Sequence, residues 1–333
     1  MKAFHINDAS GLEGLVLRES PELRPGPKQV LVKVQARSLN FRDLLILHGR
    51  YPVPAAPGIV AVSDGAGEVV ALGTGVTRVA VGDRVAGAYF PRWQAGRISM
   101  DMLGDQFGCT RDGALAPFML LDEQAAVKLP ANLSYQEGST LPCAGVTAWT
   151  ALTGPRPVLA GETVLTIRTG GVALFALQFA KAMGARVIAV TSSAEKLARL
   201  RELGADLALD RTEDPDWHSA ARDFTGGGVD HAVETGGLET PEKSAATLGA
   251  GGVLSAVAML GPGRLDTKIL AGAITLRRVY VGSRSSFEAM NRAIEAHDLK
   301  PVVAKTYAFE DTKDAYRSLE TRRHFGKLVI QGD

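Results

Sequence analysis

Two adjacent glycines, Gly170 and Gly171, separate an apolar run from a segment with helical spacing, and this arrangement could hold a phosphate-bearing ligand. Residues 162–167 are predicted to form a strand, and residues 172–183 place apolar side chains at helical intervals. The N-terminus of a helix offers backbone N–H groups to anions, and glycine leaves room for a diphosphate to approach the chain. The pattern therefore predicts a dinucleotide-binding turn, to which Thr169 and Val172 would also contribute.

The turn departs from the complete glycine fingerprint. Arg168 stands where the first glycine would be expected, and Ala173 replaces the last one. Alanine is an accepted substitute, but arginine is not an obvious one. Three interpretations remain open: the Arg168 side chain obstructs the pyrophosphate or ribose, it pairs with the phosphates and strengthens binding, or the segment is an ordinary tight turn between a strand and a helix.

The next predicted strand, residues 186–190, bears on which dinucleotide would bind. NAD enzymes usually place an acidic residue at the end of this strand, about 20 residues after the glycines, to bind the ribose hydroxyls. Here Ser192, Ser193 and Lys196 follow the strand, and Arg211 follows a later one. Hydroxyls and cations suit a 2′-phosphate, so NADP(H) is favoured over NAD(H). Ser192 could also cap a helix while Lys196 is a solvated helix charge, and both roles are compatible.

The elements around these residues divide the chain into two regions. From residue 162 onward, strands alternate with helices, which is typical of a parallel sheet covered on both faces. Further strands are predicted at 206–210, 228–234 and 252–259. Residues 1–130 are instead rich in short strands with glycine turns, including 30–36, 67–73 and 81–87, and they predict a compact barrel.

Other elements flank the parallel sheet. Residues 135–152 have helical spacing, with Ser134 and Glu137 forming a capping pattern. Helices are also predicted at 287–296 and 311–321, and a strand at 327–330. This tail could return to the N-terminal barrel. His231 lies on a predicted core strand, and we expect it to hydrogen-bond to the backbone.

Composition excludes several classes of function. The 37 basic and 36 acidic side chains nearly cancel, so no field of one sign would attract nucleic acid or an anionic membrane. Two cysteines are too few for a disulfide scaffold or a structural zinc site. No apolar run reaches the ~18–20 residues that a bilayer span needs, and the first residues lack an apolar signal core. We therefore expect a cytoplasmic protein.

In combination and order, five segments resemble the medium-chain dehydrogenase/reductase superfamily nearly end to end: residues 38–44, 63–69, 81–85, 141–149 and 324–330. The resemblance implies an α/β fold, with a GroES-like β-barrel catalytic domain at 1–130 and 285–333. A Rossmann domain with a doubly wound parallel sheet would occupy 131–284. Further cofactor contacts are expected at Thr147, Gly236, Gly282, Ser283, Phe325, Gly326 and Lys327.

The resemblance also bears on metals. Alcohol dehydrogenases of this superfamily hold a catalytic zinc, and the positions matching its ligands are Asn40, Ser63 and Cys143. One soft ligand cannot replace the three protein ligands of a catalytic zinc, so no metal is expected. Residues 91–109 fill the place of the four-cysteine structural zinc loop with a single cysteine. Cys143 is then interpreted as a small packed residue beside the nicotinamide.

The zinc-free branch looks like the quinone oxidoreductases and enoyl reductases, through Asn40-Phe41-Arg42-Asp43 and the turn at 49–52. By this resemblance, Asn40, Asp43 and Tyr51 would face the nicotinamide and the substrate. Asn40 and Tyr51 are the expected hydrogen-bond donors to the substrate oxygen, and the aromatic segment 89–96 the expected pocket wall. Alternatively, Tyr51 packs on the neighbouring proline. Arg42 could stabilise an anion or form a structural ion pair with Asp43 or Asp64.

These features predict NADPH-dependent hydride transfer to a quinone or an α,β-unsaturated carbonyl without zinc. The alternatives are a zinc-independent alcohol dehydrogenase, or a non-catalytic protein of the same fold in which Arg168 impairs cofactor binding. Residues 276–282 resemble the edge strand through which family dimers extend their sheets, so a homodimer is expected. The expected partner is a small carbonyl or quinone substrate, with no role for nucleic acid or a membrane.

Overall fold

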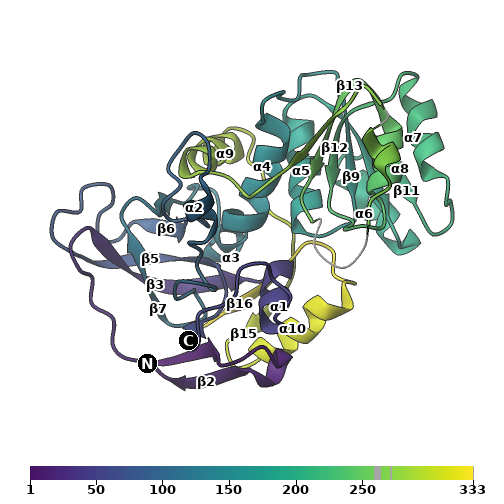
Figure 1. Ribbon diagram of the computed structural model, residues 1–333. Helices are drawn as coiled ribbons and strands as arrows, with labels where there is room; N and C mark the ends of the chain where they lie inside the picture. Colours follow the sequence, from purple (N-terminus) through teal and green to yellow (C-terminus); the bar gives the residue numbers. More distant parts are fainter. Residues whose placement is uncertain (259–263, 271, 333) are drawn as a thin grey trace. The chain divides into compact units, whose positions relative to one another are not determined.

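The computed structural model describes residues 1–258, 264–270 and 272–332. The chain forms two compact units, of which one comprises Met1–Val146 with Val281–Asp333 and the other Thr147–Tyr280. Figure 1 shows the helices and strands of both units. Among the described residues, no helix combines the length and apolar character that crossing a bilayer requires.

The unit 147–280 is built on a parallel sheet of six strands in the order β11-β10-β9-β12-β13-β14. The strands are β9 (Thr163–Ile167), β10 (Arg186–Thr191), β11 (Leu207–Asp210), β12 (Val229–Glu234), β13 (Leu248–Ala256) and β14 (Thr275–Arg278). The strand order reverses between β9 and β12. In open α/β sheets, ligands bind at the carboxyl ends of the strands beside such a reversal.

Helices connect these strands. They are α4 (Val146–Thr153), α5 (Gly171–Ala182), η3 (Ala194–Lys196), α6 (Leu197–Glu202), α7 (Trp217–Thr225), α8 (Pro241–Thr247) and η4 (Thr267–Leu270). Right-handed crossovers on either side of the reversal place α5 and α6 on one face of the sheet and the α7–α8 pair on the other. All five residues of β9 are buried, as a central strand covered on both faces requires. The predicted doubly wound parallel sheet is confirmed.

Two details of this unit differ from the sequence predictions. The strand expected at 252–259 begins earlier, at Leu248, and ends at Ala256, while Met259 lies outside the described residues. His231 does not hydrogen-bond to the backbone as expected. Its Nε2 atom contacts Arg156 and lies 3.3 Å from the Glu162 carboxylate. Charged side chains, rather than the ladder of the sheet, therefore surround this imidazole.

The other unit contains two sheets. Strands β1 (Lys2–Ile6), β2 (Leu15–Glu19) and β4 (Ile59–Val60) form a three-stranded sheet. The larger sheet has the order β15-β16-β3-β5-β6-β8, with β7 also pairing with β3. Its strands are β15 (Val303–Ala308), β16 (Lys327–Gln331), β3 (Gln29–Ser38), β5 (Asp64–Leu72), β6 (Arg84–Gly87), β8 (Ala126–Lys128) and β7 (Phe118–Asp122). The pairing of β16 with β3 joins the C-terminal segment to the N-terminal barrel, as the sequence indicated.

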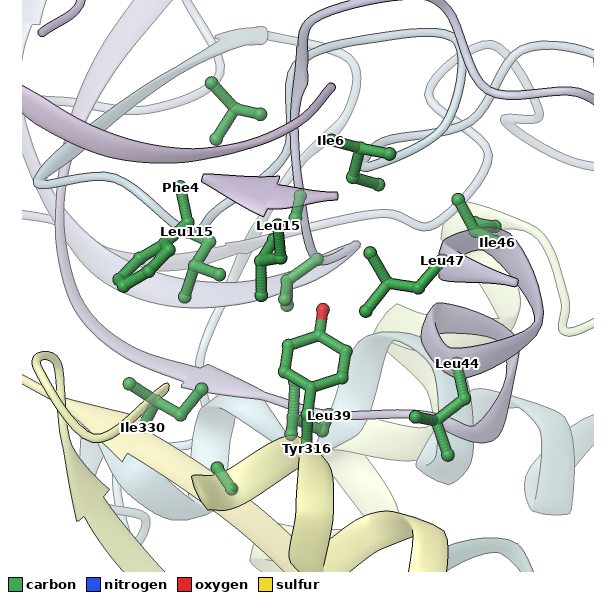
Figure 2. Close-up of a cluster of buried hydrophobic side chains, with 14 of the residues drawn as sticks. Phe4, Ile6, Leu15, Leu39, Leu44, Ile46, Leu47, Leu115, Tyr316 and Ile330 are labelled. Carbon is green, nitrogen blue, oxygen red and sulfur yellow. The ribbon is translucent and has the colours of Figure 1, made fainter. Parts of the chain in front are cut away.

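Apolar side chains hold this unit together in two clusters. In β3, Val30, Val32 and Val34 alternate into a barrel core, which confirms the period-two pattern. The second cluster packs strands against the helices α1 (Phe41–Leu47) and α10 (Thr312–Thr321). Figure 2 shows the ring of Tyr316, from α10, among the leucine side chains of this cluster. The remaining helices of the unit are η1 (Gly11–Glu13), α2 (Met100–Leu103), α3 (Tyr135–Ser139) and α9 (Arg284–Ala296).

The helix predicted at 135–152 is interrupted. Its capping pattern is confirmed, because Glu137 Oε2 accepts a hydrogen bond from the backbone N–H of Ser134 at 2.8 Å. After α3, however, the chain forms a π-helical turn, η2 (Leu141–Gly145), before α4 begins. Pro142 lies in this turn and has no N–H to donate to a regular helix. Turns of this kind are frequent at functional sites.

Candidate active site

The helix α1 presents the first group of predicted site residues. It begins after Asn40, whose backbone N–H donates to Asp43 Oδ2 at 2.8 Å. A carboxylate in the first turn accepts a hydrogen bond from a backbone N–H group that has no partner within the helix, and its negative charge interacts favourably with the helix dipole. Asp43 is thus engaged in fixing the start of α1, which in turn fixes the backbone from which the Asn40 side chain extends.

Arg42 and Asp43 form an ion pair with a nitrogen–oxygen distance of 3.2 Å, and both side chains are buried. Burial raises the pKa of Asp43, and the Arg42 charge opposes that rise. Arg42 also donates to the backbone carbonyl of Phe107 at 3.0 Å and to Gln106 Oε1 at 3.2 Å. Of the two roles considered for Arg42, these contacts favour the structural ion pair, with Asp43 as its carboxylate partner.

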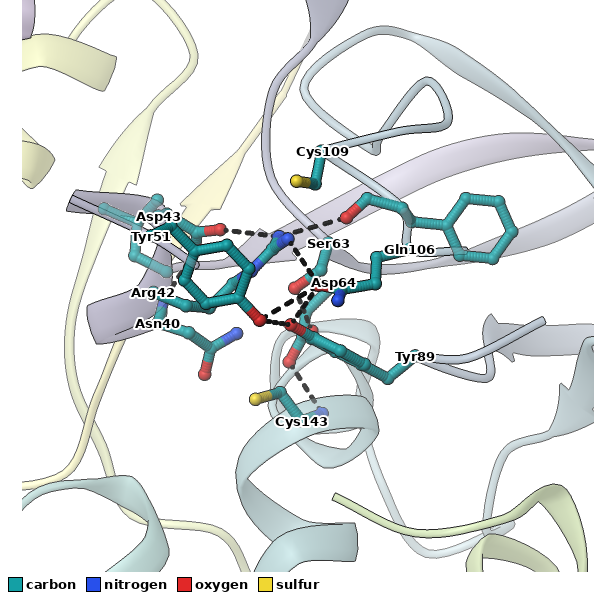
Figure 3. A network of polar contacts seen from close by, with 12 residues as sticks. Asn40, Arg42, Asp43, Tyr51, Ser63, Asp64, Tyr89, Gln106, Cys109 and Cys143 are labelled. Atoms are coloured by element: carbon teal, nitrogen blue, oxygen red, sulfur yellow. Dashed lines mark hydrogen bonds and ion pairs between the residues drawn. The ribbon is translucent and has the colours of Figure 1, made fainter. Parts of the chain in front are cut away.

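Two tyrosines meet above this guanidinium (Figure 3). The hydroxyls of Tyr51 and Tyr89 lie 3.1 Å apart, and each lies 3.0 Å from Gln106 Oε1. A carbonyl oxygen has two lone pairs, and Arg42 already donates to this one. Only one tyrosine can therefore donate to Gln106 Oε1, and the other can donate either to its partner's hydroxyl oxygen or to an acceptor on a ligand. Tyr89 is buried and Tyr51 only partly so, which makes Tyr51 the better candidate for donation to a ligand.

A lysine is buried close to Asn40. Lys327, the first residue of β16, is 4% exposed, and its Nζ donates to the backbone carbonyl of Leu39 and to Asn40 Oδ1. Burial lowers the pKa of Lys327, while Asp64, Cys143 and Asp43 oppose this effect. The sequence predicted a cofactor contact for Lys327, and the structure shows that its ammonium group is engaged with Asn40.

The carboxylate of Asp64, which lies near Lys327, accepts hydrogen bonds from Ser63 and Cys143. The Ser63 hydroxyl donates to Asp64 Oδ1 at 2.7 Å, and the backbone N–H of Cys143 donates to Oδ2 at 3.0 Å. Cys143 lies in the π-helical turn, and this turn places its backbone N–H beside the Asp64 carboxylate. Burial raises the pKa of Asp64, opposed chiefly by Lys327. Burial also raises the pKa of the Cys143 thiol, so the neutral thiol is favoured.

The positions that match a catalytic zinc site carry donors that do not fit zinc. Zinc at a catalytic site takes three protein ligands, and Cys143 is the one soft ligand among the three positions. The amide oxygen of Asn40 already accepts a hydrogen bond from an ammonium group, and the Ser63 hydroxyl donates to Asp64. Among the described residues, no group of three histidine, cysteine, aspartate or glutamate side chains is placed to hold a metal ion.

Ion pairs hold the segment that replaces the structural zinc loop. Arg92 lies 2.7 Å from Asp105, which also pairs with Arg111. Arg111 in turn lies 3.3 Å from Asp122 in β7. The segment thus has its own polar framework, and within it the Nε2 group of Gln106 donates to the backbone carbonyl of Leu103.

The glycine turn of the other unit has the geometry of an anion site. Gly170 is the N-cap of α5, and a Cβ atom added there would meet nothing within 4 Å. The backbone N–H groups at the start of a twelve-residue helix have no partners within the helix. Lys196 reaches back to this turn and donates to Thr169 Oγ1 at 3.1 Å. It is thus more than a solvated helix charge. These residues fit the diphosphate of a dinucleotide.

Arg168 adopts the left-handed conformation that a glycine would take, with φ of 72°. Its Nη2 donates to the backbone carbonyl of Gly236 at 2.9 Å and lies 3.2 Å from Glu239 Oε2. The same carboxylate oxygen lies 3.1 Å from Arg211 Nη2. Glu239 therefore bridges the two arginines that the sequence offered as phosphate contacts.

Sequence reasoning missed Glu239 and Gln106. Glu239 follows β12 closely, and a carboxylate after the strand beside the topological reversal was a usable signal. Gln106 had no such signal, because Arg42, Tyr51 and Tyr89, which contact its Oε1 atom, are distant in the sequence.

The other predicted cofactor contacts lie on both units. On the nucleotide-binding sheet, Ser193 rather than Ser192 is the N-cap of η3, and its side chain makes no capping bond. Gly236 leaves no room for a side chain beside Thr240. In the barrel unit, Ser283 caps α9 by accepting from the backbone of Ser286. Thr147 and Val172 lie in α4 and α5, Gly282 precedes Ser283, and Phe325 and Gly326 precede β16.

Comparison with known proteins decides the family. A model of the alcohol dehydrogenase GroES-like domain matches residues 26–131, and a model of the zinc-binding dehydrogenase family matches residues 171–296. A zinc-type alcohol dehydrogenase-like protein of Schizosaccharomyces pombe, C1773.06c, is 39% identical over 322 residues, which cover 94% of this chain and 92% of the relative. The chain belongs to the medium-chain dehydrogenase/reductase superfamily. It is accordingly an oxidoreductase of the alcohol dehydrogenase-like group, with a GroES-like domain and a Rossmann sheet.

Other members of the superfamily show its range. A quinone oxidoreductase of Pseudomonas aeruginosa is 29% identical over 336 residues, 96% of each chain. The crystal structure of a putative alcohol dehydrogenase from Sinorhizobium meliloti has a TM-score of 0.93 at 35% identity, covering 99% of this chain and 98% of that one.

Two further solved structures name their cofactors. An NAD-dependent alcohol dehydrogenase has a TM-score of 0.89 at 32% identity, and mycobacterial Rv1454c complexed with NADPH has 0.84 at 29%. Each covers all of both chains. Superfamily members of both cofactor types therefore resemble this chain.

Proposed function

We propose that this protein uses NADPH to reduce a quinone or an α,β-unsaturated carbonyl compound without zinc. The observation that carries the proposal is the Lys327–Asn40 hydrogen bond, which places an ammonium group where the family's metal site would need an anionic or neutral ligand. The Ser63–Asp64 hydrogen bond supports the same conclusion.

Chemistry without a Lewis acid favours substrates that spread the accepted charge. Bound NADPH would supply a hydride. An enone that accepts it at the β-carbon becomes an enolate, and a quinone becomes a hydroquinone anion. The protein then has to donate hydrogen bonds to the substrate oxygen and admit a proton. Asn40 Nδ2 and the Tyr51 hydroxyl are the proposed donors, and solvent is the proposed source of the proton. Arg42 would hold the tyrosine pair in place through Gln106.

The preference for NADPH rests on the cations beside the glycine turn. Lys196, Arg168 and Arg211 would surround a 2′-phosphate, and no acidic residue stands at the end of β10, where NAD enzymes usually have one. Gly170, Gly171 and the start of α5 would hold the diphosphate. The solved relatives include both an NAD-dependent enzyme and an NADPH complex, so the preference rests on these residues alone.

The proposal is tested by following NADPH oxidation by the purified protein with a panel of quinones, enones, saturated ketones and aldehydes. We expect turnover with the first two classes only. A strong chelator should not change the rate, and elemental analysis should find no stoichiometric zinc. Activity that is lost on chelation and restored by zinc overturns the proposal.

A zinc-independent alcohol dehydrogenase is the second candidate, because the S. pombe and S. meliloti relatives are described as alcohol dehydrogenases or similar to them. The same protein assayed with primary and secondary alcohols and NADP⁺ or NAD⁺ distinguishes the two. A non-catalytic role is the third, motivated by Arg168 in the glycine turn. It gains support if NADPH binds to an Arg168→Gly variant and not to the native protein.

A further inference from the structure

We propose that Lys327 is a positioning residue, which fixes the Asn40 carboxamide so that its Nδ2 group donates a hydrogen bond to the substrate oxygen. The inference rests on the proposed reductase function and adds to it a specific donor atom and the residue that aims it. It does not make Lys327 a catalytic residue, because the ammonium group acts through Asn40.

The first step is the orientation of the amide. An ammonium group has three N–H donors and no acceptor, so the Asn40 atom that it contacts has to be the carbonyl oxygen. Rotating the amide by half a turn would bring two donors together in a buried place. Lys327 therefore excludes the flipped orientation and determines which side of the site the Nδ2 group faces.

The second step is that the Nδ2 group is not fully used. Asn40 is 7% exposed, and its side chain interacts with the Asp64 carboxylate, but Nδ2 makes no hydrogen bond of regular geometry to the described residues. A buried donor without a partner costs about 1–3 kcal/mol. The amides of Asn132 and Asn291 in the same unit both donate, at 2.9 Å to Asp298 and 2.8 Å to the carbonyl of Lys128. The Nδ2 group carries two hydrogens, so even with Asp64 beside it one of them is left for an acceptor supplied by a ligand.

The surroundings show where that acceptor would lie. Figure 3 draws the Asn40 carboxamide in one view with the Asp64 carboxylate, the thiol of Cys143 and the paired hydroxyls of Tyr51 and Tyr89, and Asn40 interacts with Asp64. All belong to one unit and reach this place from different segments of it. A carbonyl or quinone oxygen here would accept from Asn40 Nδ2 and from the tyrosine hydroxyl that Gln106 leaves available.

The third step is the rigidity of Lys327. Its backbone N–H donates to the carbonyl of Val302 at 2.8 Å, and its ammonium group holds the carbonyl of Leu39, the residue before Asn40. Gly326, with φ of 103°, lets the chain pass close to Val302. The lysine is thus fixed at both ends, which is what a residue that aims another group requires.

The charge of Lys327 has a further effect on the amide. A cation bound to the carbonyl oxygen draws electron density from the amide and strengthens the N–H groups as donors. The nearby Asp64 and Asp43 carboxylates allow the ammonium group to stay charged although it is buried. Asn40 would then be a better donor to a developing enolate than an isolated amide.

The kinetic test compares Lys327→Met with Lys327→Arg, Asn40→Ala and the double variant Lys327→Met/Asn40→Ala. Loss of a hydrogen bond to a charged group predicts a decrease in kcat of roughly 10- to 100-fold for Lys327→Met. Lys327→Arg should recover part of the rate. The affinity for NADPH, measured by fluorescence, should stay within about 3-fold of the wild type, because Asn40 and not the cofactor is affected. In the double variant, removal of Lys327 should add little to the loss caused by Asn40→Ala.

Lys128→Met is the matched control, because it removes an exposed ammonium group that pairs with Asp83 in the same unit. It should leave kcat unchanged. Thermal unfolding of every variant separates a change of rate from a change of stability. If losses from Lys327→Met and Asn40→Ala multiply in the double variant, the two residues act independently and the proposal is wrong.

A spectroscopic test needs no turnover. The chain has four asparagines, at positions 7, 40, 132 and 291, so selective ¹⁵N-asparagine labelling gives four side-chain amide signals in the native protein. A saturated ketone added with NADP⁺ should shift the Asn40 pair and leave those of Asn132 and Asn291 in place. Lys327→Arg should also move the Asn40 pair alone. Absence of both shifts overturns the inference even if the protein is a reductase.

The two proposals fail in different ways. A wild-type protein that reduces no enone or quinone removes the proposed function, whereas the amide signals still report whether Lys327 controls Asn40. If Lys327→Met does not fold, Lys327→Arg and the ketone titration of the wild type carry the test.

Discussion

Glu239 and Arg168 form an ion pair at 3.2 Å across the mouth of the glycine turn, and Arg211 shares the same carboxylate oxygen at 3.1 Å. The Glu239 carboxylate is thus paired with the two arginines that we expect to bind a 2′-phosphate. A phosphate arriving there has to compete with Glu239, whose side chain is more than half exposed. We therefore predict that Glu239 weakens the binding of NADPH while it keeps the two arginines in position.

The change Glu239→Gln should tighten NADPH binding. Removing an exposed carboxylate from two cations is worth about 0.2–1 kcal/mol per pair, so we expect a change of a few fold. NADH lacks the 2′-phosphate and should bind as it does to the wild type. Fluorescence titration with both nucleotides checks this, with Glu242→Gln as a control on the neighbouring helix α8. An equal effect on NADPH and NADH would show that Glu239 does not act through the 2′-phosphate.

Arg168 should tolerate glycine better than alanine. A left-handed conformation costs a residue with a side chain roughly 1–2 kcal/mol, which glycine does not incur. Arg168→Gly relieves that strain while losing the contacts to Glu239 and Gly236, so its unfolding free energy should stay within about 1 kcal/mol of the wild type. Arg168→Ala keeps the strain and loses the contacts, and should be the less stable variant. Denaturant unfolding of both variants measures the difference, and equal stabilities would contradict it.

Glu123 should contribute to stability in mildly acidic solution. Backbone N–H groups of Thr77 and Arg78 and the ammonium group of Lys28 lower its pKa to about 2, from a usual value of 4.5. A depressed pKa means that the native state prefers the charged form. Its contribution is then present above pH 4.5 and is lost as the pH falls towards 2.

The variant Glu123→Gln should accordingly be less stable than the wild type at neutral pH and should lose less stability on acidification. Thermal melts between neutral pH and the acid range measure both effects. Glu22→Gln, at an exposed position, is the control and should follow the wild type. Parallel curves for the wild type and Glu123→Gln would show that another group dominates acid unfolding.

The Tyr316 hydroxyl should be dispensable, in contrast to its ring. The ring is fully buried in the cluster beneath α1 and α10, and the hydroxyl has no hydrogen-bond partner among the described residues. Tyr316→Phe removes an unsatisfied polar atom and should leave stability equal or raise it by about 1 kcal/mol. Tyr316→Ala leaves a cavity and should cost about 3–5 kcal/mol. Chemical denaturation measures both, and a marked loss in Tyr316→Phe would reveal a bound water or other partner.

The edge strand β14 should mediate dimer formation. It ends the parallel sheet, and its Leu276 side chain is exposed. An uncovered edge strand with an exposed apolar residue readily pairs with another chain. Leu276→Lys should shift a dimer towards monomer without unfolding it, as measured by sedimentation and circular dichroism. Leu159→Lys, which changes an exposed leucine outside the strands, is the control. If the wild type is a monomer in solution, the prediction that β14 mediates a dimer is wrong.

The nucleotide-binding sheet was largely predictable from local sequence. Each of its central strands is a short apolar run, because both faces are covered, and glycine or charged residues mark the ends. The helix after the glycines follows from its apolar spacing, and the parallel direction of the strands follows from their alternation with helices. The edge strand β14 is mostly exposed and ends at Arg278, earlier than the predicted 276–282. The strand order and the left-handed Arg168 required the structure.

The barrel site was less predictable. The resemblance to a known family pointed to Asn40, Tyr51 and Lys327, but their contacts are not local. Lys327 meets Asn40 across 287 positions of the sequence, and Gln106 meets Arg42 across 64. Periodicity and capping rules report on neighbours within a few residues, so they cannot reveal such pairs. The interruption of the predicted helix at Leu141–Gly145 shows the same limit, since Pro142 alone would suggest a kink and not a π-helical turn.

The pairing of β16 with β3 has a consequence for synthesis on the ribosome. Ser38 leaves the exit tunnel long before its partner Val329 is translated. During this time the edge of β3 that pairs with β16 has no partner strand, while the whole nucleotide-binding unit emerges and can fold. The hydrogen bond from Lys327 to Asn40 can form only when β16 pairs with β3. A nascent chain would therefore complete the nucleotide-binding unit before the contact between Lys327 and Asn40 can form.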